Sequence, residues 1–475
     1  MSDADIIIVG SGMGGATLAA GLKGSGLRVL IVERGQLLRD SPEARDPDAI
    51  FRDGHYRPDE TWLTPQGERF NPGNYAYVGG NSKFYGAVMM RYREADFAQH
   101  WPVGHATLAP FYTRAEALFQ VRGDASFDPS EPPHDAPYPH PPVPHEPDIA
   151  DLAIRLKHAG LTPSPLPLAV NLDRWLARGQ TPWDAHPDTN GGKLDAESAA
   201  LADAFKDPNI TLRTGVTVRK IETEGDRVTA LITSGGRLTA TRIVLAAGAV
   251  HTAALLLKSA SEAHPNGLAN RSDQVGRNFM NHNASAVLAV SHRRNRSVYQ
   301  KTLQINDWYA EGLGNVQLLG RVSTPILAAQ AGLPKPLAAV IANHAIDFYA
   351  MSEDLPNPDS RVTIKGDDIV LDWKRSNWDA HLALVARLKK TLKKAGFPIV
   401  LSKAFDRRTP SHQCGTARLG DDPASSVCDP LGKAHDLDNL YICDASLLPT
   451  SAAVNPSLTI AALALRQADH LKETT

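Results

Sequence analysis

A glycine-rich run near the N-terminus, Gly10-Ser11-Gly12-Met13-Gly14-Gly15, has the spacing of a dinucleotide-binding turn. Gly10 allows the sharp turn, Gly12 lets the backbone approach a pyrophosphate, and Gly15 lets a helix pack closely on a strand. The first N–H groups of the following helix are unpaired and carry a partial positive charge. The pattern therefore predicts that a dinucleotide binds here through its pyrophosphate.

Glu33 is a second residue that such a site would use. It follows the next strand-like run, where its carboxylate can accept hydrogen bonds from a ribose diol. A negative charge at this position also repels a 2′-phosphate, which disfavours NADP. The motif by itself leaves FAD and NAD open, with a purely structural turn as a third alternative.

The residues around the motif predict the elements that position it. Apolar runs and the intervening glycines indicate a strand at 5–9, a helix at 16–24 and a strand at 28–32. In such a βαβ unit the glycine turn lies at the carboxyl end of the first strand, where ligands of α/β sheets bind.

The rest of the chain predicts further groups of elements. Strand-like runs separated by tight turns indicate a small antiparallel meander that feeds a buried strand. A later region has strands and a long helix of its own, which indicates a different layer. The ranges are 210–213, 216–222 and 227–233 for the meander, 242–246 for the strand it feeds, 286–290, 361–364, 369–371 and the helix 378–395 for the later layer, and 440–444 for a last buried strand before a C-terminal helix.

The composition limits the class of protein. With 475 residues, 42% apolar and 21% charged, the chain is expected to be a soluble globular protein of about two domains. Its net charge of −2 provides no basic field for nucleic acid. An export signal is not apparent and no apolar run approaches the roughly 20 residues that cross a bilayer, so a cytoplasmic protein without a membrane span is expected. Cys414, Cys428 and Cys443 are interpreted as packed, reduced thiols.

Several segments, in order along the chain, resemble those of the glucose-methanol-choline (GMC) oxidoreductases. The most specific lie in the C-terminal tail, and the others are distributed over the first 282 residues. The tail segments are His412-Gln413-Cys414-Gly415-Thr416-Ala417-Arg418-Leu419-Gly420, Asn439-Leu440-Tyr441, Asp444-Ala445-Ser446 and Asn455-Pro456, and the earlier ones are Gly79-Gly80-Asn81-Ser82, 244–249 and 275–282.

The resemblance implies an α/β fold in two domains. An FAD-binding domain of the Rossmann-like ββα type would comprise residues 1–125, 200–285 and 405–475. A substrate-binding domain, built on an antiparallel sheet with flanking helices, would comprise residues 126–199 and 286–404 and cover the isoalloxazine. Non-covalent FAD is expected, because residues 83–85 read Lys-Phe-Tyr where some relatives carry a histidine bonded to FAD.

The resemblance also assigns expected contacts to FAD. Val216 would contact adenine through its backbone, residues 80–82 would run beside the flavin, and Asp444 and Ala445 would contact the diphosphate or the ribityl chain. The full set of expected cofactor contacts is Gly10, Gly12, Met13, Gly14, Gly15, Glu33, Arg34, Gly79, Gly80, Asn81, Ser82, Val216, Ala247, Gly248, Asp444, Ala445, Asn455 and Pro456.

His412 and Asn455 occupy the positions of the family's catalytic pair. Oxidation of an alcohol requires a base for the hydroxyl proton and an acceptor for the hydride. Histidine suits the first role because its pKa of about 6.5 lets it change protonation state near neutrality. Flavin N5 suits the second. We therefore expect His412 to be the general base and Asn455 to hydrogen-bond and orient the substrate hydroxyl.

Asn455 has a second interpretation. Asparagine is a preferred N-cap and proline is favoured at the first helical position, so Asn455-Pro456 would start a helix whatever the function. The N-terminus of that helix could also stabilise the negative charge of reduced flavin. Helix cap and catalytic residue thus remain alternatives for Asn455.

Other histidines are weaker candidates. His134, His140 and His145 lie in the proline-rich stretch 127–147, which is interpreted as a solvated loop, and no metal site is expected. His282 could line the site or bridge two domains, and the sequence does not decide between these roles. Trp101 and Tyr112 are interpreted as packing residues.

The leading hypothesis is an FAD-dependent oxidase or dehydrogenase that acts on a CH–OH group of a sugar, glycoside or other polyol or alcohol. The preference for sugars rests on family breadth and on polar residues such as Gln300, Lys301 and Asn306. A redox-neutral lyase that retains FAD and an NAD-dependent dehydrogenase are the alternatives. The electron acceptor, whether dioxygen, a quinone or a protein, stays open.

Overall fold

The computed structural model describes residues 2–176, 183–409 and 412–474. A five-stranded parallel sheet carries the N-terminal glycine turn, and its strands next to the turn are buried, whereas its edge strand at 210–214 is partly exposed. This is the predicted α/β fold, and the βαβ unit at its centre is confirmed. In spatial order the strands are β18 (Leu440–Ile442), β10 (Ala240–Leu245), β1 (Ala4–Val9), β2 (Val29–Glu33) and β6 (Ile210–Thr214).

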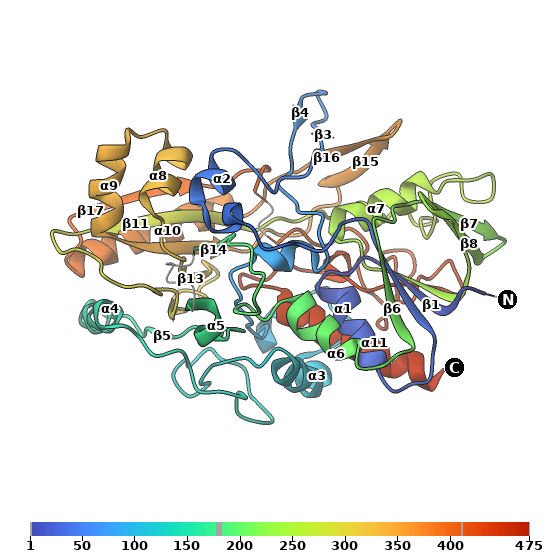
Figure 1. The fold of residues 1–475 in the computed structure, drawn as a ribbon, viewed down its shortest axis with the longest axis horizontal. Coiled ribbons are helices and arrows are strands. Elements are labelled where there is room, and N and C mark those ends of the chain that lie inside the picture. The colour runs from blue at the N-terminus through green and yellow to red at the C-terminus, as the bar shows by residue number, and fades with distance from the viewer. Residues whose placement is uncertain (1, 177–182, 410–411, 475) are drawn as a thin grey trace.

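Two long helices pack together against this sheet (Figure 1). They are α1 (Met13–Leu22), which follows the glycine turn, and α11 (Ser457–Glu473), the C-terminal helix. A Cβ on Gly21 would lie 2.5 Å from the Cβ of Ala468, so the two helices are close enough to exclude a larger residue. Helix α3 (His105–Leu118) covers the outer side of α11, and α7 (Ala249–Lys258) follows β10.

The prediction of the meander was wrong for one strand, which lies in another sheet. β7 (Val218–Glu224), β8 (Arg227–Thr233) and β9 (Gly236–Leu238) form a three-stranded antiparallel sheet. The run at 210–213, expected in that meander, is instead β6 and pairs in parallel with β2 at the edge of the large sheet. A short apolar run fits either sheet equally well, and the partner strand decides which one it joins.

A six-stranded antiparallel sheet with helices on both faces forms the second layer, as expected. Val287 and Ala289 pack on α4 (Pro147–His158) and α10 (Trp378–Lys394), whereas Leu288 packs on α8 (Thr324–Ala331) and α9 (Lys335–His344). The strand order is β17 (Ile399–Ala404), β11 (Asn283–Val290), β14 (Ala345–Ser352), β13 (Asn315–Leu318), β12 (Leu303–Ile305) and β5 (Ser164–Pro165).

Two strands assigned to that layer from the sequence lie elsewhere. β15 (Arg361–Lys365) and β16 (Asp368–Asp372) form a separate four-stranded sheet with β3 (Trp62–Leu63) and β4 (Arg69–Phe70). Val370 pairs in parallel with Leu63, which is a contact between segments far apart in the chain. Local periodicity carries no information about such a pairing.

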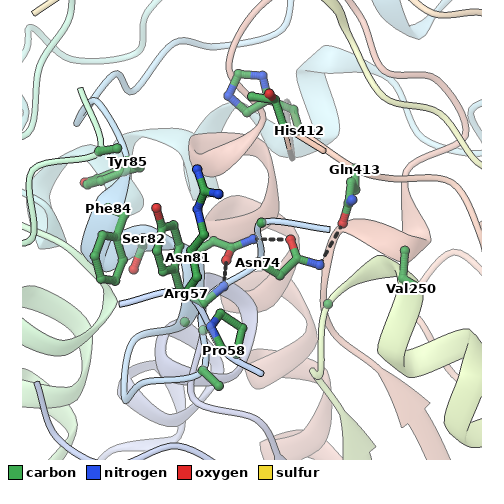
Figure 2. Close-up of a pocket in the computed structure, with 18 of the residues that line it drawn as sticks. Arg57, Pro58, Asn74, Asn81, Ser82, Phe84, Tyr85, Val250, His412 and Gln413 are labelled. Atoms are coloured by element: carbon green, nitrogen blue, oxygen red, sulfur yellow. Dashed lines mark hydrogen bonds between the residues drawn. The ribbon is translucent and has the colours of Figure 1, made fainter. Parts of the chain in front are cut away.

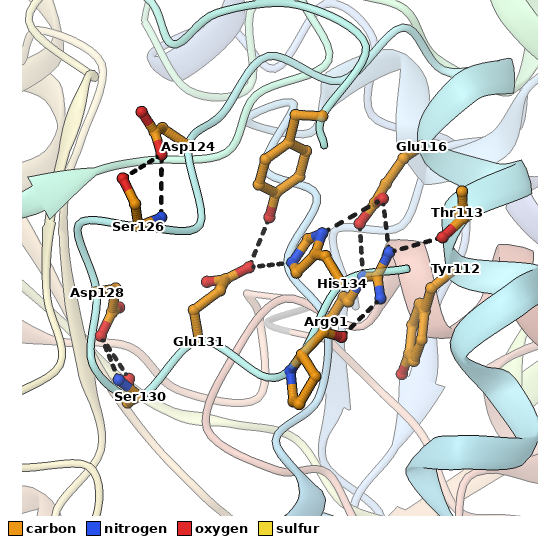
Figure 3. Close-up of polar contacts among 12 residues, drawn as sticks. Arg91, Tyr112, Thr113, Glu116, Asp124, Ser126, Asp128, Ser130, Glu131 and His134 are labelled. Atoms are coloured by element: carbon orange, nitrogen blue, oxygen red, sulfur yellow. Dashed lines mark hydrogen bonds and ion pairs between the residues drawn. The ribbon is translucent and has the colours of Figure 1, made fainter. Parts of the chain in front are cut away.

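The proline-rich stretch lacks helices and strands from 123 to 146, as expected, but His134 within it is not solvated (Figure 3). The side chain of His134 is 6% exposed, and its Nε2 lies 2.9 Å from Oε1 of Glu131. Nδ1 of the same ring lies 3.8 Å from Glu116, which forms a buried ion pair with Arg91 at 2.7 Å. These contacts anchor the loop to α3, so the prediction of a solvated loop was wrong for His134.

The remaining described helices are short. They are α2 (Pro47–Phe51), α5 (Leu172–Leu176), α6 (Ala202–Ala204), a π-helix at Ala196–Leu201 and 3₁₀ helices at Pro42–Arg45, Gly80–Phe84, Glu94–Phe97 and Ala445–Leu447. Within the described ranges, every helix is too short or too polar to cross a bilayer. The division of the chain at 125, 199, 285 and 404 stays a prediction.

Candidate active site

A cavity of about 1860 Å³ extends from the glycine turn to the antiparallel sheet. Its wall includes Gly12 and Val216 from the first layer, Leu288 and Tyr349 from the second, and His412. Pockets for single small ligands usually measure about 300–1,000 Å³. The cavity is therefore large enough to hold a dinucleotide and a second small molecule together.

Three of the four glycines of the turn, Gly10, Gly12 and Gly14, have different surroundings. Gly10 has a φ of +106°, and a Cβ on Gly14 would lie 1.8 Å from the carbonyl oxygen of Cys443. Around a Cβ on Gly12, by contrast, no described atom lies within 4 Å. Gly10 and Gly14 thus bring the turn close to neighbouring backbone, whereas the backbone at Gly12 is open to the cavity.

The start of α1 also faces the cavity. Gly12 is the N-cap residue of α1, and no described side chain caps the helix. Its first N–H groups are therefore available to an anion, and the helix dipole favours negative charge there. Together with the open backbone at Gly12, this arrangement fits the pyrophosphate of FAD.

Glu33 ends β2 beside the turn and lines the cavity. Its Oε2 accepts hydrogen bonds from the backbone N–H and hydroxyl of Ser11 at 3.0 and 2.7 Å, and its Oε1 accepts from the N–H of Gly35 at 2.8 Å. The carboxylate is thus held at the edge of the turn. Its oxygens have further lone pairs with which they could accept from a ribose diol.

Most of the expected cofactor residues lie together on the cavity wall. Gly15 and Gly79 lie behind it: a Cβ on Gly15 would be 2.1 Å from the carbonyl oxygen of Gly10, and the N–H of Gly79 donates to the Ser11 hydroxyl. Those on the wall are Gly10, Gly12, Met13, Gly14, Glu33, Arg34, Gly80, Asn81, Ser82, Val216, Ala247, Gly248, Asp444, Ala445, Asn455 and Pro456.

Asp444 holds the protein's own backbone. Its Oδ2 accepts from the N–H of Gly248 at 2.9 Å and from the hydroxyl of Thr252 at 2.6 Å. Its Oδ1 accepts from the N–H and hydroxyl of Ser446 at 2.8 and 2.5 Å. Burial raises the pKa of this carboxyl group. Asp444 therefore joins the loops after β10 and β18 on the cavity wall.

His412 lies where the C-terminal tail crosses the cavity, with a φ of +66°. This conformation is uncommon for a residue with a Cβ and persists where the surroundings enforce it. Cys414 and Met280 exchange two backbone hydrogen bonds of 3.0 Å just after it. Gln413 accepts from Nδ2 of Asn74, whose Oδ1 accepts from Asn81 (Figure 2). These contacts fix the backbone that carries the imidazole.

The imidazole of His412 contacts two side chains. Its Nε2 lies 3.2 Å from Nδ2 of Asn455, and its Nδ1 lies 2.8 Å from Nδ1 of His282. Asn455 lines the cavity beside His412, while the His282 ring is 1% exposed and lies behind it. The structure thus brings the predicted pair together, and it excludes His282 from the cavity wall.

Burial favours the neutral form of both histidines. Burial lowers the pKa of His412 well below its ordinary value, and the nearby His282 and Lys301 lower it further. Burial lowers the pKa of His282 to about 4. A neutral imidazole at His412 retains a lone pair, which is the form that a general base requires.

Asn455 is not the residue that caps α11. The helix begins at Ser457 with Pro456 at the cap position, and no described side chain caps it. The Asn455 amide contacts His412 instead, and its Oδ1 accepts from Nε2 of Gln317 at 2.8 Å. The open N-terminus of α11 lines the cavity, so its dipole favours negative charge there.

Gln317 and Asp184 are site residues that the sequence did not indicate, whereas Lys301 was one of the polar residues considered for the substrate. All three line the cavity, and Nζ of Lys301 lies 2.6 Å from Oδ2 of Asp184. The alternating pattern of β13 could have indicated Gln317 as an inward polar residue, but no local signal marks Asp184.

The structure also places the other polar, aromatic and cysteine residues that the sequence singled out. Gln300 and Asn306, considered as substrate contacts, are buried away from the cavity wall: Gln300 donates to Asp347, and Asn306 donates to Asp128. Tyr112 is buried and bonds Thr459, in keeping with packing. The three cysteines are free and buried, as predicted. Among the described residues, no cluster of His, Cys, Asp or Glu could hold a metal ion.

Comparison with known families matches three parts of the chain. Family models described as GMC oxidoreductase match residues 167–284 and 356–464. A model described as an FAD binding domain matches residues 5–43, which include the glycine turn and Glu33. The matched segments thus contain both the expected nucleotide site and the tail that carries His412 and Asn455.

Similar proteins extend over nearly the whole chain. Paromamine 6′-oxidase of Streptomyces fradiae is 29% identical over 98% of this chain and 90% of its own length. The fructose dehydrogenase large subunit of Gluconobacter japonicus is 26% identical over 98% of this chain and 97% of its own. The crystal structure of pyridoxine 4-oxidase from Mesorbium loti superposes with a TM-score of 0.68, at 21% identity, over 98% and 99% of the two chains, which shows the same fold.

Proposed function

The chain belongs to the GMC oxidoreductase family, and we propose that it oxidises a CH–OH group of a sugar, glycoside or other polyol with His412 as the general base. That it is an FAD-binding oxidoreductase of CH–OH donors follows from the family. The observation that carries the finer proposal is the contact of His412 with Asn455 on the wall of the same cavity as the glycine turn.

His412 would take the hydroxyl proton at Nε2. A substrate hydroxyl in the place of the 3.2 Å contact between His412 and Asn455 would donate to Nε2 of His412 and accept from Nδ2 of Asn455. The bond from Gln317 to Oδ1 of Asn455 keeps the NH₂ group of that amide directed at His412. FAD, when bound, supplies the acceptor for the hydride that leaves the same carbon. The product is a carbonyl compound.

The proposed FAD contacts are the cavity-lining residues of the first layer. The open backbone at Gly12 and the uncapped start of α1 would hold the pyrophosphate, and Glu33 would accept from a ribose. Lys83 forms ion pairs with Asp195 and Glu197 at 2.9 and 2.7 Å, so the stretch 83–85 offers structural contacts and no histidine. We therefore propose that FAD binds without a covalent bond.

The polar groups near His412 support a substrate with several hydroxyl groups. Asp184 could accept from a hydroxyl and Lys301 could donate to one, while Gln317 lies beside Asn455 on the same wall. Two of the similar proteins are named for oxidation of paromamine and of fructose. A sugar or related polyol is thus the substrate class that both arguments favour.

Anaerobic stopped-flow measurement of flavin absorbance, with a panel of sugars, polyols and simple alcohols, tests the proposal. A polyol is expected to bleach the flavin of the wild-type protein. In His412→Gln, with FAD still bound, bleaching should be at least about 100-fold slower, since a general base contributes a factor of about 10²–10⁴ to the rate. His158→Gln, which changes an exposed histidine on α4, is the matched control. Unchanged bleaching in His412→Gln would remove the base assignment, and turnover without bleaching would favour the lyase alternative.

A further inference from the structure

A second histidine lies directly behind His412. His282 immediately precedes β11, and its Nδ1 lies 2.8 Å from Nδ1 of His412. On its other side, Nε2 of His282 lies 2.9 Å from the carbonyl oxygens of both Ser451 and Ala452. The His282 ring therefore joins the tail at His412 to the loop before α11.

The two carbonyls determine where the proton of His282 resides. A carbonyl oxygen can only accept a hydrogen bond, so Nε2 of His282 must carry the hydrogen and donate. Burial keeps His282 neutral, with its pKa lowered to about 4. Its Nδ1 is then a bare acceptor, and the 2.8 Å contact requires His412 to donate from Nδ1. A neutral His412 with hydrogen on Nδ1 carries its lone pair on Nε2.

The contacts on the cavity side lead to the same tautomer. Nε2 of Gln317 donates to Oδ1 of Asn455 at 2.8 Å, which places the NH₂ group of Asn455 toward Nε2 of His412. An NH₂ group can only donate, so Nε2 of His412 must accept. Nε2 of Gln317 also donates to Oδ1 of Asn315 at 3.3 Å, which favours this orientation of its amide.

We propose that His282 is a positioning residue that fixes the tautomer and the ring orientation of His412. The inference rests on the proposed role of His412 as general base. In the other tautomer, Nε2 of His412 would carry a hydrogen and could not take the hydroxyl proton of a substrate. His282 makes that tautomer unfavourable, because it would place two bare nitrogens against each other in a buried contact.

A pair of variants separates positioning from space filling. In His282→Gln, the amide oxygen can accept from Nδ1 of His412 while the NH₂ group donates to Ser451 and Ala452, so most of the anaerobic flavin reduction rate should remain. In His282→Leu the acceptor is lost, and the rate should fall by about 100-fold, within the contribution of a general base. The apparent dissociation constant of the substrate should change less than about 3-fold, because His282 lies outside the cavity wall.

The opposite order would overturn the inference. Leucine is apolar and suits a purely space-filling role. If the flavin of His282→Leu is reduced as fast as that of wild type, His282 does not act through His412. The same conclusion follows if the flavin of His282→Gln is reduced as slowly as that of His282→Leu. His412→Gln measured in parallel keeps the two proposals distinct. If the flavin of His412→Gln is reduced at the wild-type rate, the proposed role of His412 as general base has failed, whatever the two His282 variants show.

The tautomer can be observed in the wild-type holoenzyme, even if His282→Leu does not fold. Nitrogen-15 NMR of protein labelled in its histidine rings distinguishes nitrogens with and without hydrogen, and the spectra of His412→Gln and His282→Gln assign the two rings. We expect hydrogen on Nδ1 of His412 and on Nε2 of His282 above pH 7. Hydrogen on Nε2 of His412 would overturn the inference.

Discussion

Nδ2 of Asn455 lies 3.2 Å from Nε2 of His412, across a chain separation of 43 residues. The contact joins the tail segment before β18 to the start of α11, and both residues line the cavity that begins at the glycine turn. A substrate hydroxyl at this point would meet a donor and an acceptor at once.

We expect Asn455→Asp to slow flavin reduction by about 10- to 100-fold and to move its acid limb to higher pH. The new carboxylate removes the donor to the substrate oxygen, and its negative charge stabilises the imidazolium form of His412. Rates of anaerobic flavin reduction between pH 5 and 9 provide the measurement. An acid limb at the wild-type position would show that the two side chains do not interact in the working enzyme.

Wild-type protein should retain its flavin reduction rate below pH 6.5. Burial and the neighbouring His282 and Lys301 lower the pKa of His412, so the imidazole stays unprotonated to lower pH than an ordinary histidine. The active form is therefore present above the lowered pKa and is lost as the pH falls through it. A rate that already falls to half near pH 6.5 or above would contradict this assignment of the base.

Two alanine substitutions in the glycine turn should have different effects: Gly14→Ala should impair folding, and Gly12→Ala should impair FAD binding. In Gly14→Ala the Cβ would meet the carbonyl oxygen of Cys443 at 1.8 Å, so the protein should be strongly destabilised or insoluble. In Gly12→Ala no described atom lies within 4 Å of the Cβ, so the apoprotein should fold, with a methyl group directed into the cavity. Circular dichroism, thermal unfolding and the FAD content after gel filtration measure these effects. Folded Gly12→Ala with full FAD content would contradict the proposed pyrophosphate site.

Asp347, in the middle of β14, should make stability depend on pH. Burial raises its pKa to about 7, although the N–H of Val322 and Nε2 of Gln300 donate to its Oδ2. A carboxyl group with a raised folded pKa stabilises the fold at pH values below its unfolded pKa, and this stabilisation is lost as the pH rises toward 7.

Asp347→Asn removes this dependence. Relative to wild type, the free energy of unfolding of Asp347→Asn should rise by about 2–3 kcal/mol between pH 5 and pH 8, because wild type loses about 1.4 kcal/mol for each pH unit between 5 and the folded pKa of about 7. Urea unfolding at the two pH values measures the change. Asp421→Asn, at an exposed position, is the control and should show no such difference. An equal pH response in both variants would show that Asp347 is not a buried titrating group.

Local sequence was sufficient for the elements that carry the nucleotide site. The strand at β1, the turn at Gly10 and the helix after it depend on apolar runs and on glycines whose conformations are set within a few residues. The helix at 378–395 was likewise predictable from periodicity, whereas the antiparallel sheet of the second layer was implied by the family resemblance. The tail motif identified His412 and Asn455 through resemblance, and no local propensity distinguishes His412 from the other histidines.

Tertiary structure decided which of these residues meet. His282 and His412 are 130 residues apart, and the backbone bridge between Met280 and Cys414 holds their two segments side by side. The same holds for β6 and β16, whose partners lie far away in the chain, and for His134, whose acidic partners remove it from solvent. Backbone conformation follows from neighbouring residues, whereas burial and hydrogen-bond partners depend on which distant segments the folded chain places side by side.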